Sequence, residues 1–420
     1  MTKGRALLWL LGVVAAFGAL ASEAGRLLLK GQDYAYSSFN DIYFYTAMVF
    51  NLWGEPISVG QEVAERGFSV TNEEWLVFYG GRSDFWATHV HPENGLSHQP
   101  PWAYRIVVPS LAAGFRLLGV PLDVAYLIIY VASAVLLALS VFRLLRPFVR
   151  KEWWAAAVSL GVLTAALAAT SPGYPDMTFL GLASLAVLYA YRQKGLHFAL
   201  AGLAAGLTRE TAVLLAASWL MVTWAQGSLT WKSTIYAIGP LAGVAAPRFL
   251  VEVPNSKVDY LGMIASPSTW TQVIFWAVMA FALVAFTSPV LFRWQVRPNL
   301  ERVDWVEAAL VLVAGLFVLA AALLSLASSR MALLVLPLLL APTSWRGLRS
   351  HYWVVASLVA TIGYAVGDTL AFRGDPPFGP FPWLGLALLA VGLKIVALRV
   401  ERTFGQPAGR SQGRSDSWAS

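Results

Sequence analysis

Charged and phenolic side chains interrupt the long apolar runs of this sequence at a few places. They are Asp41 in SSFNDIYFYTAM, Tyr104 and Arg105 in HQPPWAYR, Asp176 in TSPGYPDMTF, Arg209 and Glu210 in LTRETA, Arg248 in APRFLVE, and Arg330 in ASSRMA. A carboxylate can take the proton of an acceptor hydroxyl, while guanidinium groups bind a phosphate bidentately and stabilise the charge of a departing group. Together these residue types indicate transfer of a group from an anionic donor.

Most of these residues also have a structural interpretation. Asp41 follows Asn40 at the start of an apolar stretch, where it could cap a helix, and Asp176 could cap a helix that begins at Met177. Arg330 could extend along a helix to reach lipid headgroups. Arg209 and Glu210 favour function, because two adjacent charges between apolar runs are costly in a membrane.

The three histidines of THVHPENGLSHQPP, which are His89, His91 and His98, suggest a metal site. Zinc sites need ligands at set spacings, and no matching carboxylate pattern accompanies this loop. Hydrogen bonding at the membrane surface is the favoured interpretation. No metal ligand is assigned.

The elements that must position the chemistry are apolar segments of about 17 to 22 residues that recur along the chain, in which hydrophobic residues make up 58% of the total. Backbone amides in hydrocarbon must pair within their own segment, so the segments are predicted to be helices. The fold class is all-α, a polytopic transmembrane bundle of about 12 spans. The expected helices cover 6–22, 122–142, 154–170, 177–191, 197–207, 211–226, 234–250, 270–291, 305–327, 331–343, 352–368 and 381–398.

This arrangement puts both termini in the cytoplasm of a multi-pass cell-membrane protein. Most Lys and Arg residues then fall on the inner side and most Asp and Glu residues on the outer side, as the positive-inside rule requires. The candidate residues therefore share the extracytoplasmic face. Because the basic residues sit in short clusters between spans, the net charge of +7 reports topology and indicates no nucleic-acid partner.

Residues 1–400 are expected to form one transmembrane domain, and residues 401–420 a disordered cytoplasmic tail. The segment 23–121 is the longest outer loop, with interfacial helices. Within it, the apolar run 106–120 is predicted to be a surface or re-entrant helix that Pro109 and Arg116 interrupt. Counting this run as a span would invert the downstream topology, so eleven to thirteen spans stay open.

In order and spacing, residues 1 to about 340 resemble the GT-C superfamily of integral-membrane glycosyltransferases, which includes protein mannosyltransferases and bacterial aminoarabinose transferases. The resemblance rests on Asp41 after the first helix, HQPPWAYRIVVPSLA, Asp176 at the mouth of a helix, the LTRE step and ASSRMALLVLPLLL. It implies a GT-C-like fold and an inverting transfer of a sugar from a polyprenyl-phosphate donor to an acceptor hydroxyl of a lipid, glycan or protein.

The resemblance also implies roles for the residues. Asp41 would be the general base; Arg105, Arg209 and Arg330, with Tyr104, would contact the donor phosphate; and Asp176 and Glu210 would position the acceptor or act as a second acid. Some family members use a divalent cation such as Mg²⁺ or Mn²⁺ and others use none, and this chain has no outer Asp-x-Asp.

Two departures leave alternatives open. The family often has Asp-Glu where this chain has Asn40-Asp41, so Asp33 is a rival for the base, and no large soluble C-terminal domain is present to read an acceptor. A secondary transporter of an anionic or amphipathic solute is the main competing function. Transporters place their charges near the bilayer midplane, however, and here they gather at one face. A non-catalytic subunit of a larger assembly is the third alternative.

Overall fold

The computed structural model describes residues 42–52, 102–148, 152–251 and 253. The described residues form helices and connecting turns, and no β-strand occurs among them. The elements in chain order are α2 (Ile42–Leu52), η5 (Trp102–Tyr104), α5 (Val107–Leu117), α6 (Leu122–Leu145), η6 (Arg146–Phe148), α7 (Glu152–Ala169), α8 (Pro175–Tyr191), α9 (Gly195–Thr208), η7 (Glu210–Ala212), α10 (Val213–Ala225), α11 (Trp231–Thr234), η8 (Ile235–Ala237) and α12 (Ile238–Leu250).

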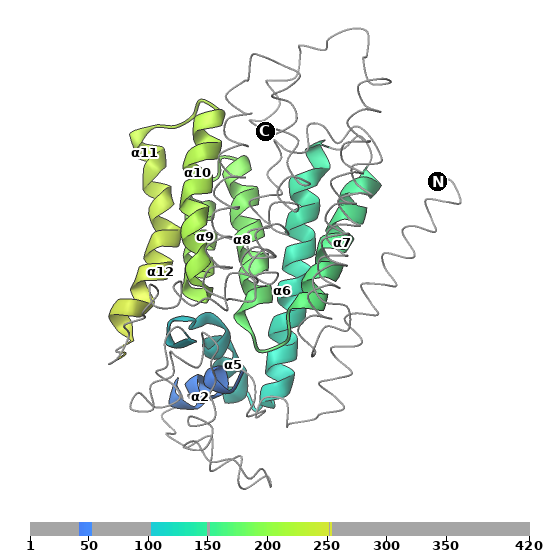
Figure 1. The fold of residues 1–420 in the computed structure, drawn as a ribbon, viewed down its shortest axis with the longest axis vertical. Coiled ribbons are helices and arrows are strands. Elements are labelled where there is room, and N and C mark those ends of the chain that lie inside the picture. The colour runs from blue at the N-terminus through green and yellow to red at the C-terminus, as the bar shows by residue number, and fades with distance from the viewer. Residues whose placement is uncertain (1–41, 53–101, 149–151, 252, 254–420) are drawn as a thin grey trace, which may run out of the picture.

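The longer helices α6 to α10 and α12 lie side by side as an up-and-down bundle, and α2 and α5 pack at one end of it (Figure 1). Every helix expected between residues 122 and 250 is present, with boundaries shifted by up to four residues. The other expected helices, the loop histidines, Asp33, Asp41, Arg330 and the tail 401–420 lie outside the described residues.

Glycine pairs allow α9 and α12 to approach closely. Residues 202–206 read GLAAG and residues 239–243 read GPLAG, so each helix carries two glycines four positions apart. A Cβ atom on Gly206 would lie 2.7 Å from backbone atoms of Pro240 and Gly243, and one on Gly202 would lie 2.8 Å from the ring of Pro240. Small residues at this spacing are typical of helix contacts in membranes, where close backbone approach provides the packing energy.

The run 106–120 contains a short helix, α5, which is continuous from Val107 to Leu117. The expectation that Pro109 and Arg116 interrupt it is wrong. Pro109 lies in the first turn, where its missing N–H has no intrahelical acceptor to lose, and Arg116 lies in the last turn. Leu111 and Leu117 of this helix and Leu118 directly after it are exposed, as a helix in an apolar interface would require.

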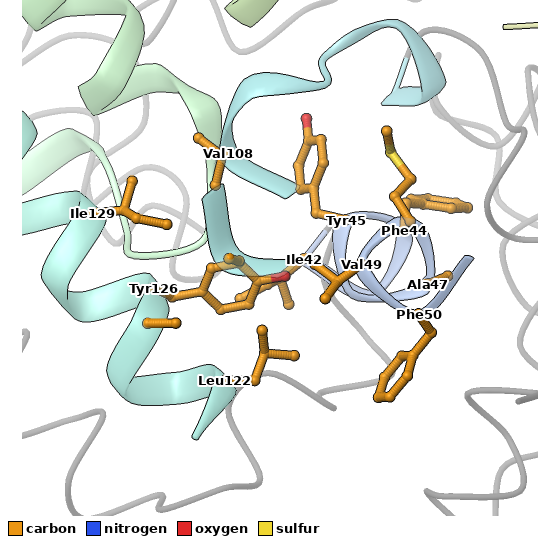
Figure 2. Close-up of a cluster of buried hydrophobic side chains, with 13 residues drawn as sticks. Ile42, Phe44, Tyr45, Ala47, Val49, Phe50, Val108, Leu122, Tyr126 and Ile129 are labelled. Carbon is orange, nitrogen blue, oxygen red and sulfur yellow. The ribbon is translucent and has the colours of Figure 1, made fainter. Parts of the chain in front are cut away.

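Helix α2 is fastened to the bundle by a hydrophobic cluster (Figure 2). Side chains of α2 pack against Val108 of α5 and against Leu122, Tyr126 and Ile129 of α6. Every described side chain before Asn51 in α2 is buried, which is typical of a helix that is apolar on every face. Burying a large apolar side chain contributes about 1.5–3 kcal/mol, so this cluster fixes the short helix in place.

Within the described ranges, one helix meets the length and composition of a membrane span. Helix α6 has 24 residues and contains an 18-residue stretch with a mean hydropathy of 2.4, and several of its apolar side chains are exposed, among them Val124, Ile128, Val135 and Leu139. Helices α5, α9 and the η7–α10 segment are apolar but shorter. A buried core helix of a soluble protein meets the same criterion as α6, so the twelve-span bundle stays a prediction.

Candidate functional site

A charged cluster lies at the end of the bundle where α2 and α5 pack. Its first pair joins Arg105, in the connection between η5 and α5, with Glu210, the first residue of η7. Arg105 Nε donates to Glu210 Oε1 and Oε2 at 3.3 and 3.4 Å, and Nη2 donates to Oε2 at 3.3 Å. The arginine is buried, whereas a quarter of the glutamate side chain remains exposed. Glu210 is therefore the accessible member of the pair.

Tyr45 of α2 supplies a further partner of Arg105. Arg105 Nη1 donates to the Tyr45 hydroxyl at 3.0 Å, and the Tyr45 side chain is fully buried. The neighbouring backbone is also fixed, because Ile106 N–H donates to the carbonyl of Leu207 at 3.1 Å. These contacts connect α2, the η5–α5 connection and the end of α9.

The second pair is the ion pair between Arg209 Nη1 and Asp176 Oδ1. Arg209 is an extended residue between α9 and η7, and Asp176 lies in the first turn of α8. Both side chains are buried. Asp176 does not precede the helix as a cap would; it follows Pro175, which begins α8, and its charge is favourable at a helix N-terminus.

Neighbouring side chains keep Arg105 and Glu210 in their charged forms. Burial alone would lower the pKa of Arg105, but Glu210 and Tyr45 outweigh it and raise that pKa above its ordinary value. Burial would raise the pKa of Glu210, but the positive charges of Arg105 and Arg209 lower it below the ordinary range. Each charge thus depends on its neighbours, and the four side chains of Arg105, Glu210, Arg209 and Asp176 have no net charge.

Tyr104 meets another arginine. The guanidinium carbon of Arg248, in the last turn of α12, lies 4.9 Å from the centre of the Tyr104 ring. Arg248 Nη1 also donates to the Val244 carbonyl, and the Arg248 side chain is exposed. An arginine over an aromatic face is stabilised by the ring quadrupole. This stack lies beside Arg105 in the chain and contributes a positive charge to the same end.

Six of the residues singled out from the sequence therefore meet at one end of the bundle: Tyr104, Arg105, Asp176, Arg209, Glu210 and Arg248. Asp41 and Arg330 fall outside the described residues. Ile42, which follows Asp41 in the chain, begins α2 and lies against the connection that leads to Asp176: a Cβ atom on Gly173 would lie 2.5 Å from Ile42 Cδ1. Gly173 has φ +83°, which favours glycine, so the close approach and the turn both require it.

Sequence reasoning missed one contributor, Tyr45, and the contact made by another, Arg248. Tyr45 belongs to the run Tyr43-Phe44-Tyr45, and nothing in that run distinguishes the hydroxyl that reaches Arg105. Arg248 was visible as a basic residue at a helix end, but its stacking on Tyr104 joins positions 144 residues apart in the sequence, which local patterns do not reveal.

The cluster is built from two carboxylates that each face a guanidinium. In the part of the chain that the structure describes, no three His, Asp or Glu side chains gather as a metal site would need. The arrangement suits recognition of an anion that competes for a guanidinium, since Arg–carboxylate and Arg–phosphate contacts use the same fork of donors.

Comparison of the chain with protein-family models, with curated proteins and with solved structures finds no match in any of the three.

Proposed function

We propose that this chain is a membrane glycosyltransferase of the GT-C kind that moves a sugar from a polyprenyl-phosphate donor to an acceptor hydroxyl. The observation that carries the proposal is the meeting of residues from α8, the α9–α10 break and the η5–α5 connection at one end of a helical bundle. The helix that begins directly after Asp41 packs at that same end. A donor, an acceptor and a base need such a shared face.

In the proposed reaction Asp41 takes the proton of the acceptor hydroxyl, whose oxygen attacks the anomeric carbon of the sugar. The bond between that carbon and the phosphate oxygen breaks, and the polyprenyl phosphate leaves with the electron pair. A single displacement of this kind inverts the anomeric configuration. Guanidinium groups stabilise the charge of the leaving phosphate.

The charged cluster supports this function by placing a guanidinium beside an accessible carboxylate. Arg105 is anchored by buried Tyr45 at 3.0 Å, whereas its contacts with Glu210 are longer, at 3.3 to 3.4 Å. Charge-assisted contacts are commonly 2.7–2.9 Å. A donor phosphate would compete with Glu210 for Arg105, and the displaced carboxylate would be free to meet the acceptor.

Asp176 and Arg209 would contribute in a different way. Because both are buried and paired with each other, they would hold the α9–α10 break, and with it Glu210, against the start of α8. A buried pair of this kind fixes the register of the segments that carry it. Under the proposal Asp176 positions Glu210 and thereby the acceptor.

The test measures transfer of label from polyprenyl-phosphate-linked hexose and pentose donors in membranes that contain the chain. General-base catalysis contributes about 10²–10⁴-fold, so Asp41→Asn is expected to reduce transfer by at least about 10²-fold without loss of the folded protein. Asp33→Asn is the matched control and should retain activity. Full activity of Asp41→Asn would remove the base assignment, and loss in Asp33→Asn alone would move it to Asp33.

The transporter alternative can be tested with the same protein. Purified chain in proteoliposomes that lack any lipid-linked sugar would take up solute if the charged end served transport. Uptake that depends on Arg105 or Glu210, with no sugar transfer in membranes, would contradict the proposed function.

A further inference from the structure

The arginines at the charged end differ in how their charge is used. Arg105 and Arg209 each form an ion pair with a carboxylate, and both are buried. Arg248 is exposed, and among the described residues no carboxylate lies in ion-pair range of it. The four-residue cluster therefore does not neutralise the positive charge of Arg248.

The side chain of Arg248 is held rather than loose. Its guanidinium lies over the Tyr104 ring, with the ring centre 4.9 Å from Cζ, and one of its nitrogens donates to the Val244 carbonyl in the preceding turn. A guanidinium has five N–H donors, so most of them remain for a ligand. Stacking limits the rotamers of a long side chain, which reduces the entropy lost when it binds.

The surroundings of Arg248 indicate what kind of ligand would reach it. Phe249 and Leu250, which follow it at the end of α12, are among the most exposed apolar side chains of the described residues. An exposed guanidinium beside exposed apolar side chains fits a molecule with an anionic head and an apolar tail.

We propose that Arg248, stacked on Tyr104, binds the phosphodiester anion of a lipid-linked molecule at the charged end of the bundle. The inference rests on the proposed function, in which that molecule is the sugar donor. It changes the assignment of the first phosphate contact, because Arg105 and Arg209 are already paired with carboxylates. Arg248 brings the anion to the cluster, where it meets Arg105.

The test measures binding of dihexyl phosphate to the purified chain in detergent by titration calorimetry. This compound is a lipid phosphodiester that stays a monoanion over the usable pH range. Trihexyl phosphate has the same group without the charge, and dimethyl phosphate has the charge without the tails. The variants are Arg248→Gln, Tyr104→Leu and Arg116→Gln. Arg116 is the matched control, since its guanidinium stacks on Phe50 with the ring centre 4.2 Å from Cζ.

The expected result is that Arg248→Gln weakens dihexyl phosphate binding by about 10-fold or more, as removal of a charged hydrogen-bond donor does. Tyr104→Leu should weaken it less, because the charge remains but is no longer held. Arg116→Gln should bind within about twofold of the wild type. Trihexyl phosphate should bind weakly to every variant. Melting temperatures confirm that each variant is folded.

Several outcomes would overturn the inference. Unchanged binding in Arg248→Gln, or an equal loss in Arg116→Gln, would remove Arg248 as the anion contact. Equal binding of trihexyl phosphate would show that the site does not recognise the negative charge. Equal binding of dimethyl phosphate would show that the site does not recognise the apolar tails. These measurements need no sugar transfer: if they succeed while the transfer assay fails, the anion site stands and the glycosyltransferase proposal falls.

Discussion

Three arginine–carboxylate pairs of this chain form a graded series that tests how burial sets the cost of losing a charge. The Arg209–Asp176 pair has side-chain exposures of 2% and 0%, the Arg105–Glu210 pair 6% and 25%, and the Arg146–Glu152 pair 59% and 65%. The perturbation is the same in each case: the acid is replaced by its amide, as Asp176→Asn, Glu210→Gln and Glu152→Gln. Shape is retained and one charge is removed.

The expected losses of unfolding free energy follow the exposures. Breaking a fully buried pair leaves an uncompensated charge and costs about 3–5 kcal/mol, which applies to Asp176→Asn. Glu210 is partly solvated, so Glu210→Gln should cost about 1–3 kcal/mol, the range for leaving a buried polar partner incompletely satisfied. An exposed pair contributes about 0–1 kcal/mol, so Glu152→Gln should be close to the wild type.

The assay is thermal unfolding of the purified protein in one detergent, followed by circular dichroism at the helix band. The double variant in which Asn replaces Asp176 and Gln replaces Arg209 should regain part of the loss of Asp176→Asn, because no unpaired charge is then buried. Equal shifts for the three single variants would show that burial does not set the cost of losing the charge. A larger loss for Glu152→Gln than for Asp176→Asn would show that the Arg209–Asp176 pair is not more deeply buried than the Arg146–Glu152 pair.

Two further predictions concern the anchor of Arg105 and the sidedness of the bundle. Tyr45→Phe should lower the unfolding free energy by about 1.5–3 kcal/mol. The Tyr45 hydroxyl accepts a hydrogen bond from buried Arg105, and without it one charged N–H donor of Arg105 has lost its acceptor. A melting temperature equal to that of the wild type would contradict this prediction. The chain has no cysteine of its own, so single cysteines can be introduced at exposed Ser110 and Lys194. Because these residues lie at opposite ends of the bundle, they should react with an impermeant reagent from opposite faces of a sealed vesicle. Labelling of both from the same face would contradict the predicted membrane topology.

The helices could be predicted from the sequence because the apolar runs are long and continuous and lack the two-residue alternation of strands, and those from α6 to α10 follow that pattern. The start of the last described helix could not. The run 234–250 predicts one helix, whereas α11 and η8 precede α12. Thr230 and Ser233 form a reciprocal cap there without the glutamate or glutamine that usually marks such a cap in a sequence.

The site was predictable as a set of residues and not as a set of contacts. The sequence indicated that Arg105, Arg209, Asp176 and Glu210 share one end, and the structure brings them together. Nothing in the sequence indicates that each arginine faces a carboxylate. Such pairings depend on how three separate segments pack, and spacing along one helix does not determine them. The roles of Arg105 and Arg209 as phosphate contacts stay predictions.

The most direct test of the proposed function is an experimental structure of the chain with a polyprenyl-phosphate sugar bound in lipid or detergent. We predict an isoprenoid tail in a groove that leads to Asp41, with the phosphate in contact with Arg248 at the end of the bundle that holds Arg105 and Glu210. A donor bound at the opposite end, near Arg192 and Lys194, or a bound donor whose sugar lies far from Asp41, would contradict it.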